Sequence, residues 1–339
     1  MTRTPKRRRA RRGLVGTAVV LVVLVLLVIT VRQVNAWRFG TAADVGDPQD
    51  LSTYALDQEG MSVEHITGDY LNGFHLVPDE ATRDGVVVTF GGSEGSPDYE
   101  RAVGLAAEGY EVYSLFFFGQ DNQRPQLDRV PLEFFDELLD RLDDDAGPVT
   151  VLGSSKGAEL ALLLATDYPE IDNVVLYAPT VHVFQALAGA AESHSSWTRD
   201  GQEVPFLSFR DASPGALMEQ LSATAFNFPV AYRATYESVV EGADPADVEA
   251  ATLDPRAVTG GLLVFAGGDD AMWQGDTAAH RIDEDMPDAQ VHVYPEAGHV
   301  FRGDGRIGML ETGGTAEANE AAGRDAEQAL LETLTAWHD

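Results

Sequence analysis

The sequence contains no cysteine. Disulfide bonds, thiolate nucleophiles and cysteine-ligated metal sites are therefore excluded, and an oxidising compartment places no demand on the chain. Basic residues are also scarce, with 23 Lys and Arg against 55 Asp and Glu and a formal net charge of −32. Such an acidic chain argues against nucleic-acid binding and against electrostatic docking on anionic lipid. We interpret the excess acid as a highly soluble or salt-adapted surface rather than a binding patch.

Acidic residues are missing from the start of the chain, where none precedes Asp44. Seven basic residues instead precede an uncharged stretch, residues 14–31, that is almost wholly Val, Leu, Ile and Ala. We expect a basic cytoplasmic tail at 1–13 and a transmembrane anchor at 14–31, because this length spans a bilayer and the basic flank stays inside. A cleaved signal peptide is the alternative, since Val34-Asn35-Ala36 resembles a cleavage site, but its apolar region is usually only about 7–15 residues long.

One stretch, VTVLGSSKGAELALLLAT at residues 149–166, combines an apolar run, a Gly-x-Ser-x-Gly turn and an apolar run at helical spacing. This pattern is typical of a nucleophile elbow, in which a strained turn between strand and helix exposes the central serine. Ser155 is the predicted nucleophile, and the backbone N–H of Lys156 is a predicted oxyanion donor. The pattern alone is weak, because short motifs of this kind arise by chance.

The same pattern occurs a second time, at residues 91–95, also after an apolar strand. Glu94 would place a carboxylate beside a developing oxyanion, so the electrostatics of acyl transfer favour Ser155 over Ser93 as the nucleophile. In an α/β-hydrolase the earlier strand end supplies the other oxyanion N–H. We therefore assign the backbone of Gly92 and Ser93 to the oxyanion hole.

A serine nucleophile needs a histidine base and a carboxylate that orients it, in the chain order Ser, acid, His in this fold. Asp269 and Asp270 follow the predicted strand 261–266, and His299 follows the predicted strand 290–294. Both loops belong to the sheet edge where ligands bind. We predict Asp270 as the acid, with Asp269 as the alternative, and His299 as the base.

The hydrophobic pattern predicts an α/β-hydrolase fold, a doubly wound and mostly parallel sheet, over residues 61–339. Residues 32–60 contain Gly, Asp and Pro with little periodicity, which predicts a linker. The strand pattern lapses between about 181 and 259, which we interpret as a cap over the site. The predicted elements are strands at 62–67, 71–77, 86–90, 110–116, 149–152, 173–178, 261–266 and 290–294, and helices at about 98–108, 131–142, 156–166 and 317–338.

The segments LGSSKGAELALLLAT, SSWTRDGQEVPF, AGGDDAMW and YPEAGHVF together resemble the catalytic domain of the acyl-CoA thioester hydrolase and bile acid-CoA:amino acid N-acyltransferase family. The resemblance runs from about residue 85 to the C-terminus. It implies an α/β-hydrolase with Ser155, Asp270 and His299 in the catalytic roles, and acyl-thioester hydrolysis or acyl transfer as the chemistry. The β-sandwich that precedes this domain in mammalian members does not fit in the short segment between anchor and sheet.

These observations predict a membrane-anchored, extracytoplasmic serine hydrolase of small acyl esters or thioesters that needs no cofactor or metal. Serine at position 155 gives an acyl-enzyme that water can cleave, which favours hydrolysis over amino-acid N-acyl transfer. Three alternatives stay open: transfer to an acceptor other than water, a peptidase of similar fold, and a non-catalytic envelope binding protein on a hydrolase fold. The apolar cap favours acyl chains over peptides. We predict no nucleic-acid partner, and the oligomeric state is not predicted.

Overall fold

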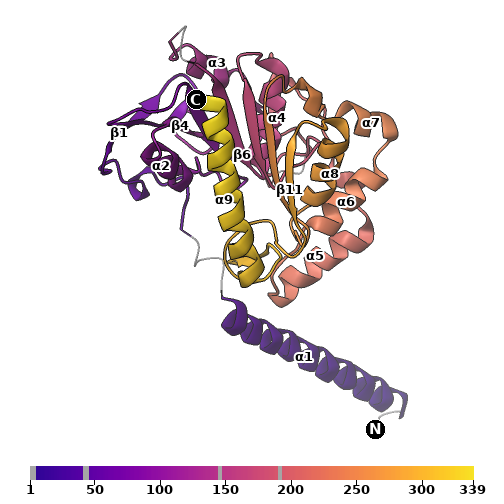
Figure 1. Ribbon diagram of the computed structural model, residues 1–339. Coiled ribbons are helices and arrows are strands. Elements are labelled where there is room, and N and C mark those ends of the chain that lie inside the picture. Colours follow the sequence, from indigo (N-terminus) through magenta and orange to yellow (C-terminus); the bar gives the residue numbers. More distant parts are fainter. Residues whose placement is uncertain (1–4, 41–45, 144–146, 190–192) are drawn as a thin grey trace.

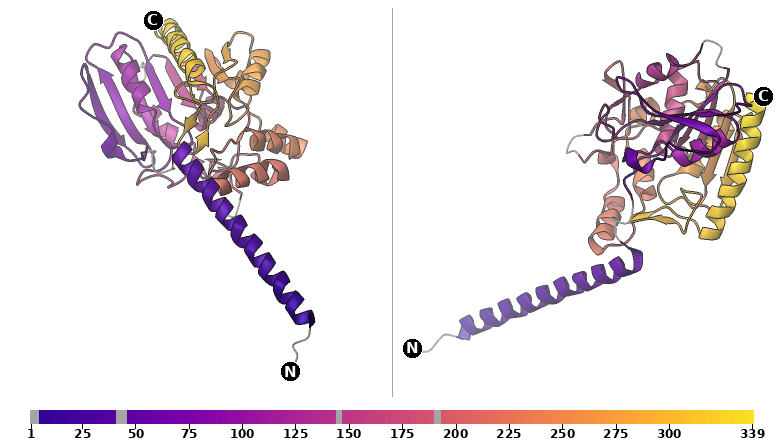
Figure 2. Two further views of the ribbon diagram at one scale, coloured as in Figure 1. Left: turned by 90° about the horizontal axis from the view of Figure 1, so that it is seen from below. Right: turned by 90° about the vertical axis from the view of Figure 1, so that its left-hand side faces the viewer.

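The structure is a computed structural model that describes residues 5–40, 46–143, 147–189 and 193–339. The first four residues of the predicted tail, residues 41–45 of the predicted linker and residues 190–192 of the predicted cap lie outside the described residues. A single long helix, α1 (Pro5–Phe39), projects from a layered α/β body (Figures 1 and 2).

The body is built on a central sheet of eight strands within the described ranges, in the order β1-β2-β4-β3-β6-β7-β10-β11. Strands β1 and β2 form an antiparallel hairpin, β2 pairs antiparallel with β4, and every pairing from β4 to β11 is parallel. The strands are β1 (Met61–Thr67), β2 (Asn72–Pro78), β3 (Val86–Phe90), β4 (Glu111–Phe116), β6 (Val149–Ser154), β7 (Asn173–Tyr177), β10 (Leu262–Gly267) and β11 (Gln290–Tyr294). The predicted mostly parallel sheet is confirmed, with an antiparallel hairpin at its start.

Helices cover both faces of the sheet (Figure 1). Alternate residues of β3 show why: Val86 and Val88 enter one apolar core, whereas Val87 enters the other. One face carries α3 (Phe134–Leu139), α4 (Lys156–Asp167) and α8 (Gly275–Asp285), and the other carries α2 (Tyr99–Ala107) and α9 (Ala316–His338). A sheet buried on both faces needs near-continuous apolar strands, as the sequence has. The α/β-hydrolase fold class follows from this topology.

The segment predicted as a cap contains helices of its own, around a separate apolar core that includes Phe184, Leu207 and Tyr236. Helix α5 begins at Pro214, after the N-cap Ser213, whose hydroxyl accepts a hydrogen bond from the Ala216 N–H. This combination of cap and first-turn proline starts helices. The elements are β8 (Trp197–Arg199), β9 (Gln202–Glu203), η3 (Phe209–Asp211), α5 (Pro214–Phe226), α6 (Arg233–Gly242), α7 (Pro245–Ala250) and η4 (Pro255–Ala257).

The N-terminal helix is longer than predicted. It extends beyond residues 14–31 and continues through residues 32–39 of the predicted linker, so that part of the prediction was wrong. Residues 32–39 contain neither Gly nor Pro, and the helix ends where Gly40 takes a positive φ of 82° and its N–H bonds to the Ala36 carbonyl. This is a common helix ending. The remaining elements are η2 (Leu51–Thr53), β5 (Val130–Pro131), β12 (Arg306–Ile307) and β13 (Leu310–Glu311).

Candidate active site

Ser155 lies at the turn between β6 and α4, with a φ of 56° and a ψ of −116°. A non-glycine residue rarely adopts such a conformation, and backbone strain of this kind is found at functional sites. The flanking glycines make the turn possible. A Cβ on Gly153 would lie 2.0 Å from the Gly157 carbonyl oxygen, and one on Gly157 would lie 2.1 Å from the Gly91 carbonyl oxygen. The local geometry is that of the predicted nucleophile elbow.

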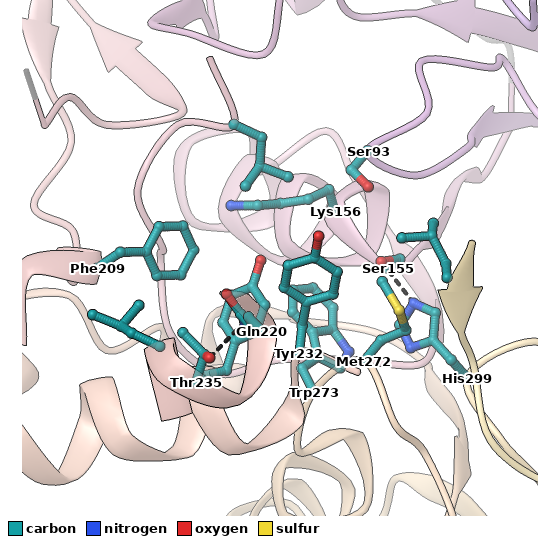
Figure 3. A pocket seen from close by; sticks show the side chains of 14 residues that line it. Ser93, Ser155, Lys156, Phe209, Gln220, Tyr232, Thr235, Met272, Trp273 and His299 are labelled. Atoms are coloured by element: carbon teal, nitrogen blue, oxygen red, sulfur yellow. Dashed lines mark hydrogen bonds between the residues drawn. The ribbon is translucent and has the colours of Figure 1, made fainter. Parts of the chain in front are cut away.

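His299 links Ser155 to Asp270. Its Nδ1 lies 2.7 Å from Asp270 Oδ2, and its Nε2 lies 2.9 Å from Ser155 Oγ (Figure 3). The buried carboxylate accepts a hydrogen bond from Nδ1–H, so Nε2 of the neutral imidazole is left to accept the serine hydroxyl proton. The structure thus brings together the three side chains that the sequence predicts, from three different strand ends.

The two neighbouring aspartates make different contacts. Asp270 is fully buried, and its second oxygen accepts the N–H groups of Met272 at 2.7 Å and Trp273 at 3.2 Å. Asp269 instead accepts the Gly314 N–H at 3.1 Å. The carboxylate that faces the imidazole is therefore that of Asp270, and Asp269 holds a neighbouring turn.

The three predicted oxyanion donors differ in their surroundings. Lys156 is the first residue of α4, where backbone N–H groups have no partner within the helix. Ser93 lines the same cavity as Ser155. The Gly92 N–H, however, donates to Glu94 Oε1 at 3.0 Å within its own loop, so the prediction of Gly92 as a free donor was wrong. Sequence reasoning overlooked this two-residue turn.

Beside Ser155 lies a cavity of about 390 Å³ with a mainly apolar wall (Figure 3). Helices α5 and α6 supply one side of it, through Leu217, Gln220, Thr235 and Tyr236. Ser155 and His299 lie on the opposite side (Figure 3), and Trp273 packs against Tyr236 with ring centroids 5.7 Å apart. A pocket with this lining suits an apolar group held next to the serine hydroxyl.

Lys156 has a second feature that the sequence reasoning missed. Its side chain is buried, and Nζ lies 2.9 Å from both carboxylate oxygens of Glu159, 3.2 Å from the Phe184 carbonyl and 3.0 Å from Ser196 Oγ. Trp197 Nε1 also donates to Glu159, at 2.7 Å. Burial lowers the pKa of Lys156, and the charge of Glu159 opposes that shift. The network joins the first turn of α4 to the first part of the cap.

The loop of His299 is held by Asn319 of α9, which is fully buried. Its side-chain oxygen accepts the Gly298 N–H at 2.8 Å, and its amide donates to the carbonyls of Gly303 and Gly313 at 3.2 Å. One side chain thereby fixes both sides of the loop. A single Asn in a helical run gives no sequence signal for such a role.

Across the described ranges, no group of three or more His, Asp or Glu side chains is arranged to hold a metal ion. The hydrogen-bonded side chains of Ser155, His299 and Asp270 have the arrangement needed for nucleophilic acyl chemistry.

Residues 130–303, just over half of the chain, match the family described as BAAT / Acyl-CoA thioester hydrolase C terminal. Acyl-coenzyme A thioesterase 1 of Rattus norvegicus is 25% identical over 235 residues, which cover 67% of this chain and 50% of the relative. Acyl-coenzyme A thioesterase 6 of Homo sapiens is 36% identical over 105 residues, 30% of this chain and 25% of the relative. Bile acid-CoA:amino acid N-acyltransferase of Mus musculus is 34% identical over 105 residues, with coverage of 30% and 25%. The chain spans half or less of the length of these curated relatives.

Among solved structures, an esterase of Pyrococcus furiosus is similar with a TM-score of 0.49 and 14% identity, covering 87% of this chain and 96% of that one. A putative dienelactone hydrolase of Klebsiella pneumoniae has a TM-score of 0.47 and 16% identity, with coverage of 82% and 97%.

Proposed function

Because the chain belongs to the BAAT / acyl-CoA thioester hydrolase C-terminal family, we propose that it is a membrane-anchored serine hydrolase that cleaves acyl esters or thioesters. The observation that carries this proposal is the hydrogen-bonded chain from Ser155 Oγ through His299 to Asp270 at the wall of an apolar cavity. The named relatives include thioesterases and an N-acyltransferase, both of which act on acyl groups.

In the proposed reaction, Ser155 Oγ attacks the acyl carbonyl while His299 Nε2 takes the hydroxyl proton. The tetrahedral intermediate collapses, and the leaving alcohol or thiol takes that proton from His299. Water then attacks the acyl-Ser155 ester with His299 again as the base, which releases the acid and restores the serine. Asp270 keeps the imidazole in the reactive tautomer throughout.

The developing oxyanion needs hydrogen-bond donors. We assign the backbone N–H groups of Lys156 and Ser93 to that role. The position of Lys156 at the start of α4 supports the first, since the helix N-terminus favours negative charge. The place of Ser93 in the cavity wall beside Ser155 supports the second.

The anchor rests on α1. Its segment Gly16–Phe39 is long and apolar enough to cross a membrane, a property that a signal sequence shares. An uncleaved helix is supported by contacts at its C-terminal end: Asn35 is buried, and its Nδ2 donates to the Phe226 carbonyl of α5 at 2.8 Å. Cleavage after Ala36 would remove this contact. The basic residues that precede this segment favour a cytoplasmic N-terminus, so we assign the hydrolase domain to the outer side.

Two other functions share this geometry. An acyltransferase would use the same acyl-enzyme with an acceptor other than water, as one relative's name indicates for that protein. A binding protein would use the cavity without forming a covalent intermediate.

A fluorophosphonate probe tests the proposal, because it reacts with serine only where a base activates the hydroxyl. The purified chain should be labelled, and Ser155→Ala should not. Ser62→Ala is the matched control: it removes an exposed serine of β1, outside the cavity, and should leave labelling intact. A folded wild-type protein that stays unlabelled would favour the binding function. If labelling occurs, turnover of aryl esters and acyl-CoA with and without amino-acid acceptors separates hydrolase from transferase.

A further inference from the structure

Helix α5 exposes an apolar stripe to the outside of the molecule. Leu217, Met218 and Leu221 are 37%, 64% and 63% exposed and lie on one side of the helix by their spacing. A helix on the surface of a soluble domain normally turns such a stripe toward the core. Here the inward side is formed instead by the buried Ala216 and by Gln220, which donates to Thr235 of α6.

The C-terminal end of α5 lies beside the end of α1 (Figures 1 and 2). Arg32 Nη1 donates to the carbonyls of Thr224 and Ala225 at 3.2 and 2.6 Å, and Asn35 donates to that of Phe226. These are the last carbonyls of α5, a position where helix carbonyls lack intrahelical partners; that of Thr224 also accepts the N–H of the C-cap Asn227 at 3.2 Å. The apolar part of α1 ends just before Arg32, so α5 is tied to the helix at the level where a spanning segment would leave the bilayer.

The apolar surface continues beyond α5. Phe228, which follows the helix, is exposed and packs against Phe39 of α1, with ring centroids 6.0 Å apart. Ile307 and Leu310 of the β12–β13 hairpin are exposed as well. We call Leu217, Met218, Leu221, Phe228, Ile307 and Leu310 together the α5 face. Contiguous exposed apolar residues of this kind mark interaction sites.

The charges near this face differ from those of the rest of the domain. Apart from the N-terminal tail the chain is strongly acidic, yet α5 has Glu219 as its only acidic residue. Arg38 and Arg306 both lie over the ring of Phe39, at 5.1 and 5.4 Å from its centroid. Arg306 is also paired with Asp304 at 2.8 Å, so the surroundings of the face are less acidic than the rest of the domain rather than basic. An apolar surface with few charges around it suits the headgroup region of a bilayer.

The face is also continuous with the cavity beside Ser155. Leu217 and Leu310 both line that cavity, and each is 37% exposed in total. Through these two leucines, the apolar wall of the cavity is continuous with the α5 face.

We infer that the α5 face lies in the outer leaflet of the membrane that α1 crosses, and that the acyl substrate enters the cavity from the lipid. This inference rests on the proposed anchor and hydrolase. It assigns the substrate to esters or thioesters with a membrane-dissolved acyl chain, and it makes the bilayer a binding partner of the catalytic domain as well as of the anchor.

The absence of cysteine makes the test direct. Single cysteines at Met218, Leu221, Leu24 in α1 and Ala336 at the far end of α9 each carry a bimane label, with the full chain in phosphatidylcholine vesicles that contain nitroxide lipid. Labels at 218 and 221 should lose roughly half of their fluorescence, because interfacial helices bury their apolar side chains about 5–10 Å into the headgroup boundary. The label at 336 should be unaffected.

The positions separate two failures. Quenching at 24 without quenching at 218 and 221 would overturn the inference and leave the anchor proposal intact. Lack of quenching at 24 would overturn the anchor itself, and this inference with it.

Activity gives a second readout. Met218→Glu/Leu221→Glu changes two residues that do not line the cavity. It should lower kcat/KM for a long-chain ester embedded in vesicles by about tenfold or more, since burial of a single large apolar side chain is worth at least that factor. Turnover of a soluble short-chain aryl ester should not change. Ala246→Glu/Ala250→Glu is the control. It adds the same two charges at exposed positions one turn apart on α7 and should leave both activities as in the wild type. Equal loss with soluble and embedded esters, or no loss with either, would overturn the inference.

Discussion

The ammonium group of Lys156 lies 2.9 Å from both carboxylate oxygens of Glu159, and neither side chain is exposed to solvent by more than 1%. Lys156 immediately follows Ser155, so the ion pair lies beneath the nucleophile elbow. Through Ser196 and Trp197 it also fixes the first part of the cap. Buried ion pairs add little net stability as a pair, but removing one partner leaves a charge unpaired in the interior.

We therefore expect Lys156→Met to lower the free energy of unfolding by about 3–5 kcal/mol, because it leaves the Glu159 carboxylate uncompensated. Glu159→Gln should have a cost of similar size. The double variant Lys156→Met/Glu159→Leu removes both charges and should recover most of the loss. Urea denaturation of the three variants measures this. Additive losses in the double variant would show that the two side chains are not energetically coupled.

From the sequence, Lys156 is predicted to act only through its backbone N–H. A lysine at the start of a helix is usually solvated, and nothing in GSSKGAE reveals that a chain segment about 40 residues later covers it. The elbow itself was predictable, because strand, turn and helix are adjacent in sequence and their glycines are sterically required. Contacts between distant segments, such as those of Ser196 and Trp197 with this pair, depend on packing that no local pattern encodes.

A second prediction concerns the two aspartates. Asp270→Asn should reduce kcat by roughly 10²–10⁴-fold, because the amide no longer enforces the imidazole tautomer that accepts the serine proton. Asp269→Asn is the matched control. Its carboxylate contacts the Gly314 N–H rather than His299, so kcat should change by only a few-fold. Steady-state kinetics on an aryl ester measure both, and the reverse order of damage would make Asp269 the acid.

The sequence limits the candidates for the acid that orients His299 to Asp269 and Asp270, because both follow a predicted strand and the loops at one edge of the sheet converge. Only the structure distinguishes them, through the direction in which each carboxylate leaves the turn.

The cap helices were predicted less completely than the site. Their mixed pattern predicted an insertion, yet the outward apolar stripe of α5 is indistinguishable in sequence from a core-facing one.

A third prediction is an acid-dependent loss of stability that originates at His182. This residue is buried, its Nδ1 has no hydrogen-bond partner among the described residues, and burial lowers its pKa to about 4. The unfolded chain therefore binds a proton below about pH 6.5 that the folded chain takes up only near pH 4. The contribution of His182 to stability is complete above pH 6.5 and falls as the pH drops toward 4, by up to about 3 kcal/mol.

His182→Gln should flatten the pH dependence of the unfolding free energy between pH 6.5 and 4. The measurement is chemical denaturation at several pH values in that range. His280→Gln, at an exposed histidine of α8, is the matched control and should retain the wild-type slope. An unchanged slope in His182→Gln would assign the acid sensitivity to other groups.

The last prediction concerns the side of the membrane on which the hydrolase works. Seven basic residues precede the apolar part of α1, whereas Arg32 and Arg38 are the only basic residues in the ten positions after residue 31. From this bias we expect the N-terminus to stay in the cytoplasm and Ser155 to lie outside. Protease added to intact spheroplasts of a bacterial host that expresses the chain should digest the domain, while a cytoplasmic marker protein stays whole.

The membrane fraction should also contain the chain at its full length, since removal of residues 1–36 would delete the buried Asn35 that binds α5. A product shortened by that segment would establish a cleaved signal peptide instead. Complete protection of the domain until lysis would place it in the cytoplasm, where acyl-CoA is available as a substrate. Digestion of the intact-length chain would restrict its natural substrates to esters or thioesters that reach the outer side of the membrane, even if the purified protein also hydrolyses acyl-CoA.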